Sequence, residues 1–173
     1  MIILMAGLPG TGKSTLARAL ADRLDGVVLG KDEIRRAIFS GRDVEYSTAQ
    51  DDFVMEIMLQ AASWLLTHDA GRFVFLDGRT FSRRYQVDRV LAAASEFHQP
   101  WRIIECVCNE ETTRARLETQ AASREHPAGN RDFRLYLDVK AHFEPITQPK
   151  IVIDTDQPLD QCMNLALAAL REL

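Results

Sequence analysis

The chain has 173 residues, enough for one domain with a sizeable core but scarcely for two. Apolar residues make up 46% of it and charged residues 27%, as in ordinary globular proteins. The net charge of −4 argues against a protein that coats DNA or sits on an acidic membrane, although it leaves room for a local basic cleft.

Short apolar runs alternate along the chain with longer segments of helical periodicity. The runs predict strands at residues 2–6, 27–29, 73–76, 103–107 and 151–153, each apolar nearly throughout, as in strands buried on both faces. The periodic segments predict helices at residues 14–24, 49–66, 84–97, 110–122, 134–143 and 159–170. This order predicts an α/β fold with five parallel strands in a three-layer α/β/α arrangement, in a single domain over residues 1–173. Ligands of such sheets bind beyond the carboxyl ends of the strands.

A phosphate-binding loop follows the first predicted strand. Gly7, Gly12, Lys13 and Ser14 satisfy the pattern G-x-x-x-x-G-K-[ST]. Glycines let backbone N–H groups converge on phosphate oxygens, and the next helix adds the positive end of its dipole. We expect Lys13 to reach the β- and γ-phosphates of ATP, or of GTP in its place, and Ser14 to hold Mg²⁺. The expected nucleotide-binding residues are Gly7, Leu8, Pro9, Gly10, Thr11, Gly12, Lys13, Ser14 and Thr15.

The remaining motifs distinguish between the classes of protein that use such a loop. A GTPase would carry an N-K-x-D motif for the base, and the sequence has none. A motor ATPase usually ends its hydrolytic strand in Asp-Glu, whereas here Asp77 is followed by Gly78. The small size and the missing glutamate favour transfer of a phosphoryl group to an acceptor rather than to water.

Asp32 is the expected general base of that transfer. It follows the strand 27–29, which we expect beside the strand of the phosphate-binding loop, and its carboxylate could accept the proton of an attacking hydroxyl. Capping of the next helix is the alternative role of Asp32. Arg35, one helical turn later, could bind a polar or anionic part of the acceptor, or could be a solvated helix charge.

The third predicted strand ends in a second polar cluster. Asp77 is the expected partner of Mg²⁺ or of the acceptor, with an ordinary Asp-Gly turn as the alternative. Arg79 and Arg83 follow it and are expected on the acceptor side of the cleft, as is Tyr46 in the loop before the third helix. Solvated loop positions are the alternative for these three side chains.

The segment after the fourth strand, residues 110–132, is expected to form a helical lid. Small kinases place arginines there that neutralise charge on the transferring group. Arg116 and Arg124 are the candidates, and the exposed face of an Arg/Glu-rich helix is the alternative.

The cysteines and the hydropathy bear on location and redox state. Cys106, Cys108 and Cys162 show no metal-binding spacing, so we interpret them as buried thiols. No apolar stretch reaches the roughly 20 residues of a membrane helix, and no signal peptide is evident. We therefore expect a reduced, cytoplasmic protein that binds no membrane.

Four motifs together resemble a known family. GLPGTGKST, DEIR, FVFLDGRTFSRR and RARL are similar to motifs of the zeta-toxin-like and polynucleotide-kinase-like P-loop kinases, whose members are often described as AAA-type ATP-binding proteins. The resemblance extends over residues 2–155 and implies the small-kinase form of the fold, with Lys13 and Ser14 as ligands of phosphate and Mg²⁺.

The same resemblance implies roles for the other motif residues. It makes Asp32 the general base, Arg35 the contact with an acceptor anion in a D-x-x-R pattern, and Arg116 the first lid arginine. One position departs from the family pattern R-L-x-x-R, because Gln120 stands at its last place, and Arg124 is the nearest replacement.

The function expected from these residues is transfer of the γ-phosphate of Mg²⁺-ATP to a hydroxyl of a small molecule. A polynucleotide 5′-hydroxyl kinase is the first alternative, with nucleic acid as acceptor. A nucleotide-dependent binding or toxin-like protein without a small substrate is the second.

Overall fold

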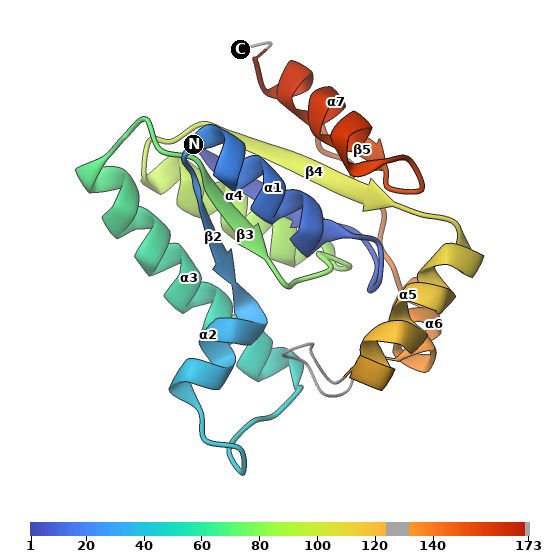
Figure 1. Cartoon of the computed structure of the whole chain (residues 1–173). Coiled ribbons are helices and arrows are strands. Elements are labelled where there is room, and N and C mark those ends of the chain that lie inside the picture. Colours follow the sequence, from blue (N-terminus) through green and yellow to red (C-terminus); the bar gives the residue numbers. More distant parts are fainter. Residues whose placement is uncertain (124–131, 172–173) are drawn as a thin grey trace.

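The computed structural model describes residues 1–123 and 132–171. Strands and helices alternate along this part of the chain (Figure 1). The elements are β1 (Ile2–Ala6), α1 (Lys13–Leu24), β2 (Val27–Gly30), α2 (Lys31–Ile38), α3 (Thr48–His68), β3 (Val74–Asp77), α4 (Arg84–Glu96), β4 (Trp101–Val107), α5 (Glu110–Ser123), α6 (Phe133–Ala141), β5 (Ile151–Asp154) and α7 (Leu159–Arg171).

The strands form one parallel sheet in the order β2-β3-β1-β4-β5. The five predicted strands and their parallel arrangement are thus confirmed. The expectation that the strand before Asp32 lies next to the loop strand is wrong, because β3 pairs with both and lies between them. Every strand end still points to the same edge of the sheet, so Gly7, Lys31 and Gly78, which follow three of these ends, share that edge.

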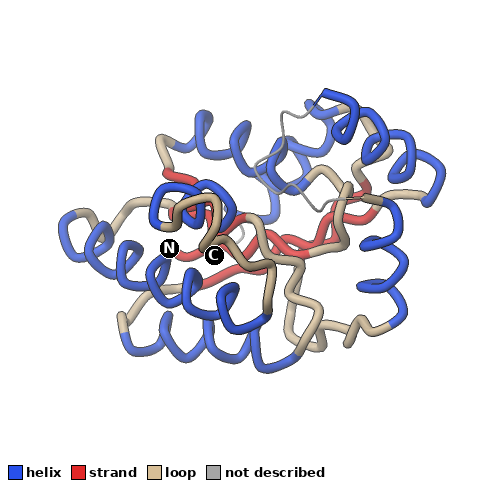
Figure 2. Tube along the Cα trace, turned by 90° about the horizontal axis from the view of Figure 1, so that it is seen from below, coloured by secondary structure: helices blue, strands red, loops and turns tan. Residues whose placement is uncertain are grey.

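Helices cover both faces of the sheet, which gives the expected three layers (Figure 2). Side chains of β1 alternate between the faces, as the pleat of a strand requires. Ile2 and Leu4 belong to a buried cluster with α3 and α4, whereas Ile3 and Met5 belong to one with α1 and α7. The central strands are therefore buried on both sides, as their apolar sequences predict.

The two edge strands depart from that pattern. Val152 of β5 is 53% exposed, and Val27, Val28 and Leu29 of β2 are only half-buried. The run of apolar residues in these strands overstates their burial, because an edge strand is covered from fewer directions.

Helix α2 is the one described helix without its own predicted segment. It begins directly after β2, and its N-cap residue is Gly30, without a side-chain hydrogen bond. Asp32 is therefore in the first turn and does not cap the helix. Figure 1 shows α2 below the end of β2, with α5 and α6 together on the other side of the same edge of the sheet. Among the described residues, no helix is long and apolar enough to cross a membrane.

Candidate active site

The phosphate-binding loop connects β1 to α1 in a conformation that depends on its glycines. Gly7 has φ 128°, and a Cβ there would lie 2.3 Å from the carbonyl oxygen of Cys106. Gly10 has φ 80°, and a Cβ there would lie 2.9 Å from the side chain of Leu117 on α5. The close approach of β4 and α5 thus excludes larger residues at both positions.

Lys13 is buried at the first position of α1 and extends back over the loop. Its Nζ donates hydrogen bonds to the carbonyl oxygens of Gly7 at 2.8 Å and Leu8 at 2.7 Å. Thr11 donates to the same Leu8 oxygen at 2.8 Å. Ser14 is half-buried, whereas Thr15 is exposed. The ammonium group and the amino end of α1 therefore occupy the place where a triphosphate would be bound.

A cavity of about 320 Å³ lies in front of this loop. Its walls are formed by the loop, α2, the start of α3, the segment after β3 and α6. Its lining includes seven of the predicted site residues, which are Pro9, Lys13, Ser14, Asp32, Arg35, Tyr46 and Arg79. The other lining residues are Lys31, Thr48, Asp51, Gly78, Thr80, Ser82, Gln86, Leu135, Asp138 and Val139.

Asp32 lies in this lining with its two oxygens in different surroundings. Only 8% of the residue is exposed. Oδ1 accepts a hydrogen bond from Arg35 Nη1 at 2.7 Å and is 3.8 Å from Lys31 Nζ. Within the described part of the chain, Oδ2 has no hydrogen-bond partner. One oxygen is thus anchored while the other can accept a proton.

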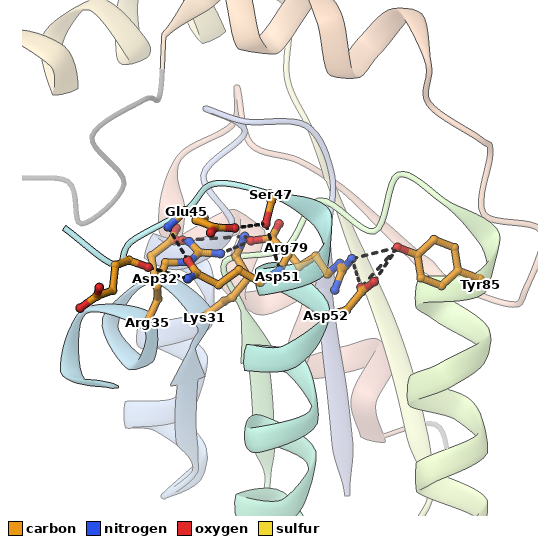
Figure 3. A network of polar contacts seen from close by, with 11 residues as sticks. Lys31, Asp32, Arg35, Glu45, Ser47, Asp51, Asp52, Arg79 and Tyr85 are labelled. Atoms are coloured by element: carbon orange, nitrogen blue, oxygen red, sulfur yellow. Dashed lines mark hydrogen bonds and ion pairs between the residues drawn. The ribbon is translucent and has the colours of Figure 1, made fainter. Parts of the chain in front are cut away.

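Asp51, in the first turn of α3, holds the two cations beside Asp32 (Figure 3). Its Oδ1 accepts from Lys31 Nζ at 2.7 Å and also from Arg35 Nη2. The guanidinium of Arg35 is 1% exposed and lies 5.4 Å from the ring centroid of Tyr46. Sequence reasoning missed Lys31 and Asp51, because a lysine and an acid at helix starts match ordinary solvated positions.

Arg79 is held by residues of two helices on the other side of the cavity. It is 5% exposed, and its Nη2 donates to Asp52 Oδ1 at 2.5 Å and to the Tyr85 hydroxyl at 3.4 Å. Tyr85 also donates to Asp52, at 3.1 Å from Oδ2. Figure 3 shows Arg79 extending between the ends of α3 and α4. Asp52 and Tyr85 are further residues that the sequence did not single out.

Asp77 ends β3 behind the cavity, and its residue type and burial fit a contact with a hydrated Mg²⁺. It is 3% exposed, and its Oδ1 is buried without a hydrogen-bond partner among the described residues. Carboxylate and hydroxyl oxygens are the ligands that Mg²⁺ takes from proteins, usually one or two of them beside phosphates and water. No three His, Cys, Asp or Glu side chains within residues 1–123 and 132–171 converge as a larger metal cage would require.

Two of the other predicted arginines, Arg83 and Arg116, lie outside the cavity lining. Arg83 donates to Glu144 Oε1 at 3.3 Å and is 43% exposed. Arg116 donates to Thr155 and has its Nη1 3.6 Å from the place of a Cβ on Gly12, which puts it beside the phosphate-binding loop. Arg124 lies outside the described residues.

Burial keeps the thiol of Cys106 protonated. Desolvation raises the pKa of Cys106 to about 12, against a smaller opposing effect of Lys13. Burial also raises the pKa values of Cys108, which is half-buried, and of Cys162, which is buried. All three cysteines are free thiols, as expected, although Cys108 is less enclosed than the prediction.

Comparison with protein families accounts for most of the chain. Residues 2–146 match the family AAA_33, described as an AAA domain. The chain belongs to this AAA domain family. No curated protein matches the sequence. Nothing in these comparisons separates the zeta-toxin-like and polynucleotide-kinase-like group from other members, so that finer assignment stays a prediction.

Solved structures identify the form of the fold in this AAA domain. The Mycobacterium tuberculosis APS kinase CysC, solved with AMPPNP and APS, has a TM-score of 0.74 at 16% identity, over 99% of this chain and 97% of that chain. Chaetomium thermophilum Kti12, solved with ADP-AlF3, has a TM-score of 0.73 at 15% identity, over 98% and 97%. A gluconokinase from Sinorhizobium meliloti 1021 has a TM-score of 0.66 at 16% identity, over 98% and 90%. The AAA domain of this chain therefore has the α/β fold of small P-loop kinases, as expected.

Proposed function

We propose that this AAA domain is an ATP-dependent kinase that transfers the γ-phosphate to a hydroxyl of a small molecule. The observation that carries the proposal is the shared cavity, which has Lys13 and Ser14 on one wall and Asp32 on another. Kinases among the structural neighbours support the same reaction class. A cavity of about 320 Å³ suits a small acceptor better than a macromolecule.

The donor side consists of the phosphate-binding loop. Backbone N–H groups of residues 7–15, apart from Pro9, and Lys13 Nζ bind the phosphates of ATP, or of GTP in its place, once the ammonium leaves the carbonyl oxygens of Gly7 and Leu8. Ser14 would hold Mg²⁺ and Asp77 would contact it through water, and the ion would supply charge neutralisation at the phosphates. Nucleotide analogues in CysC and Kti12 support binding of a nucleoside triphosphate by this fold.

The acceptor side consists of Asp32 and the residues around it. The acceptor oxygen forms a bond to the γ-phosphorus while the bond from that phosphorus to the bridging oxygen of ADP breaks. The hydroxyl proton passes to Asp32 Oδ2, because Oδ1 is occupied by Arg35. Arg35 fixes the carboxylate, and Tyr46 provides an adjacent wall of the acceptor site.

Helices α5 and α6 are proposed to cover the cavity as the lid. Leu135, Asp138 and Val139 of α6 already contribute to its lining. Arg116 lies beside Gly12, which favours a role at the nucleotide rather than at the acceptor. Closure of such a cover would exclude water and favour transfer over hydrolysis.

Substitution of Asp32 tests the proposal. Asp32→Asn keeps an acceptor for Arg35 but removes the base, so transfer should fall on the order of 10²- to 10⁴-fold while ATP affinity stays within a few-fold of wild type. Lys13→Ala should instead weaken ATP binding itself. Asp88→Asn, which changes a hydrogen-bonded aspartate outside the cavity, is the matched control. Transfer by Asp32→Asn at the wild-type rate would exclude Asp32 as the base.

Two other outcomes would point to the alternative functions. Transfer to the 5′-hydroxyl ends of oligonucleotides, with activity falling steeply as salt rises, would indicate a polynucleotide kinase. Slow hydrolysis of ATP that no acceptor accelerates, with a protein partner bound only in the presence of ATP, would indicate a binding protein.

A further inference from the structure

Among the described cations of the cavity lining outside the phosphate-binding loop, Arg79 alone has a carboxylate partner that does not itself line the cavity. Lys13 belongs to the phosphate-binding loop, and Lys31 and Arg35 share the carboxylates of Asp32 and Asp51, which also line the cavity. The carboxylate partner of Arg79, Asp52, is absent from the lining and its side chain is 43% exposed.

The hydrogen-bonding capacity of Arg79 is largely unused. A guanidinium has five N–H groups, and the two contacts of Arg79, with Asp52 and Tyr85, both involve Nη2. Its Nε is buried without an acceptor in the described part of the chain. A charged group that is 95% enclosed with unused donors is costly unless a ligand completes its hydrogen bonds.

We infer that Arg79 binds an oxyanion of the acceptor, so that the substrate is a small hydroxylated carboxylate or phosphate ester. This inference rests on the proposed kinase function and names the substrate class of the same site. The acceptor hydroxyl lies at Asp32 Oδ2, and its anionic group lies at the opposite side of the cavity against the guanidinium of Arg79.

The surrounding residues favour this arrangement over a second phosphate contact for ATP. Arg79 is fixed by Asp52 of α3 and Tyr85 of α4, both remote from the phosphate-binding loop in sequence (Figure 3). The remaining carboxylate of the lining, Asp138, has a 72% exposed side chain and is therefore well hydrated. An oxyanion at Arg79 would form charge-assisted hydrogen bonds that a neutral polyol cannot match.

Binding of simple anions to the protein saturated with AMPPNP and Mg²⁺ tests the inference. Calorimetry would measure glycerate, inorganic phosphate and neutral glycerol separately, with the nucleotide filling the phosphate-binding loop. We expect saturable binding of at least one anion and none of glycerol at the same concentration. The tighter of the two anions distinguishes a carboxylate from a phosphate ester as the acceptor group.

Two arginine variants identify the binding residue. Arg79→Met should weaken anion binding about tenfold to hundredfold, the range for a hydrogen bond to a charged group. Arg89→Met also breaks an arginine–carboxylate pair with α3, through Glu56, but lies outside the cavity lining and should change anion binding less than threefold. Arg79→Lys, which keeps the positive charge, serves as a second variant if Arg79→Met does not fold. It should weaken anion binding by less than Arg79→Met does.

The inference is wrong if neither anion binds, if glycerol binds equally well, or if Arg79→Met leaves anion binding unchanged. It is also wrong if Arg79→Met weakens AMPPNP as strongly as the anion, since Arg79 would then contact the donor. Transfer to anionic acceptors at an unchanged rate in Arg79→Met would leave the kinase intact and remove only this inference. Anion binding without any transfer would instead count against the kinase.

Discussion

The surroundings of single side chains decide what each can do at this site. Asp32 and Asp77 both follow strand ends, yet Asp32 is anchored by Arg35 whereas Asp77 Oδ1 is buried without a partner among the described residues. An anchored carboxylate has a fixed direction for accepting a proton. An enclosed, unpaired one suits a contact with the water of a metal ion. The different roles that we propose for these two aspartates, base and metal partner, thus follow from their neighbours.

The low reactivity expected of the Cys106 thiol can be tested without any measurement of catalysis. Its pKa of about 12 lies about four units above pH 8, so only about one molecule in ten thousand carries the reactive thiolate there. Iodoacetamide at pH 8 should therefore modify half-buried Cys108 well before Cys106. Peptide mass spectrometry would measure both rates, and denaturant should make them equal. Equal rates in the native protein would contradict the burial of Cys106.

The sequence predicts those site residues that follow a strand end directly. Asp32 falls into this class, because parallel strands end at one edge of the sheet. Lys13 lies further from the end of β1 and is predicted by the phosphate-binding pattern instead. Asp51, which lines the cavity, and Asp52, which binds Arg79, do not follow a strand end, since they come from the start of α3 after a loop whose path the sequence does not specify. The position of the Arg83 side chain, which pairs with Glu144, likewise depends on tertiary contacts.

At the scale of elements, the junction of α2 and α3 positions the acceptor side. Helix α2 provides Lys31, Asp32 and Arg35, and the first turn of α3 provides Asp51. Lys31 stands at the first position of α2, where the helix dipole does not favour a cation, whereas Arg35 is in the last turn. Asp51 offsets that cost and binds the two helices together.

Asp51→Ala should consequently lower the free energy of unfolding by about 1.5–3 kcal/mol, because it leaves the buried guanidinium of Arg35 with one carboxylate. Glu56→Ala, on the same helix, removes the exposed partner of Arg89 and should cost less than about 1 kcal/mol. Urea unfolding of both variants would measure the difference. Equal losses would show that the α2–α3 junction has no special role in stability.

The ends of strands and helices can be predicted from the sequence wherever the apolar pattern extends over several repeats. Every predicted strand overlaps an observed one within two residues at each end, and all six predicted helices are present. Helix α2 lacked a predicted segment because it has only eight residues, starts with three charged or polar positions and follows β2 without a loop. A short helix of this kind carries too few periods for detection.

At the scale of the whole molecule, stability comes from two buried clusters, one on each face of the sheet. Leu20 of α1 is fully buried in one of them, whereas Leu165 of α7 is 53% exposed. Leu20→Ala should lower the free energy of unfolding by about 2–5 kcal/mol, and Leu165→Ala by less than about 1 kcal/mol. Chemical unfolding checks the pair. Similar losses of unfolding free energy in the two variants would contradict the assignment of the α1 face to the core.

The three-layer arrangement was predictable from the alternation of strands and helices, but the position of each strand was not. Insertion of β3 between β1 and β2 depends on how Ile2 to Leu4 pair with Val74 to Leu76, which apolar sequences alone do not specify. That insertion also places Asp77 and Arg79 between the phosphate-binding loop and α2. The cavity is therefore a property of the assembled sheet rather than of any one motif.

The most direct measurement identifies the molecule that receives the γ-phosphate of ATP. Protein, Mg²⁺-ATP and a pool of small hydroxylated acids and phosphate esters would be analysed by mass spectrometry, with Asp32→Asn beside the wild type. We expect one member of the pool to gain one phosphoryl group for each ADP formed. Asp32→Asn should bind ATP without forming the phosphorylated product. Formation of ADP and inorganic phosphate alone, at the same rate with and without the pool, would contradict phosphoryl transfer to an acceptor.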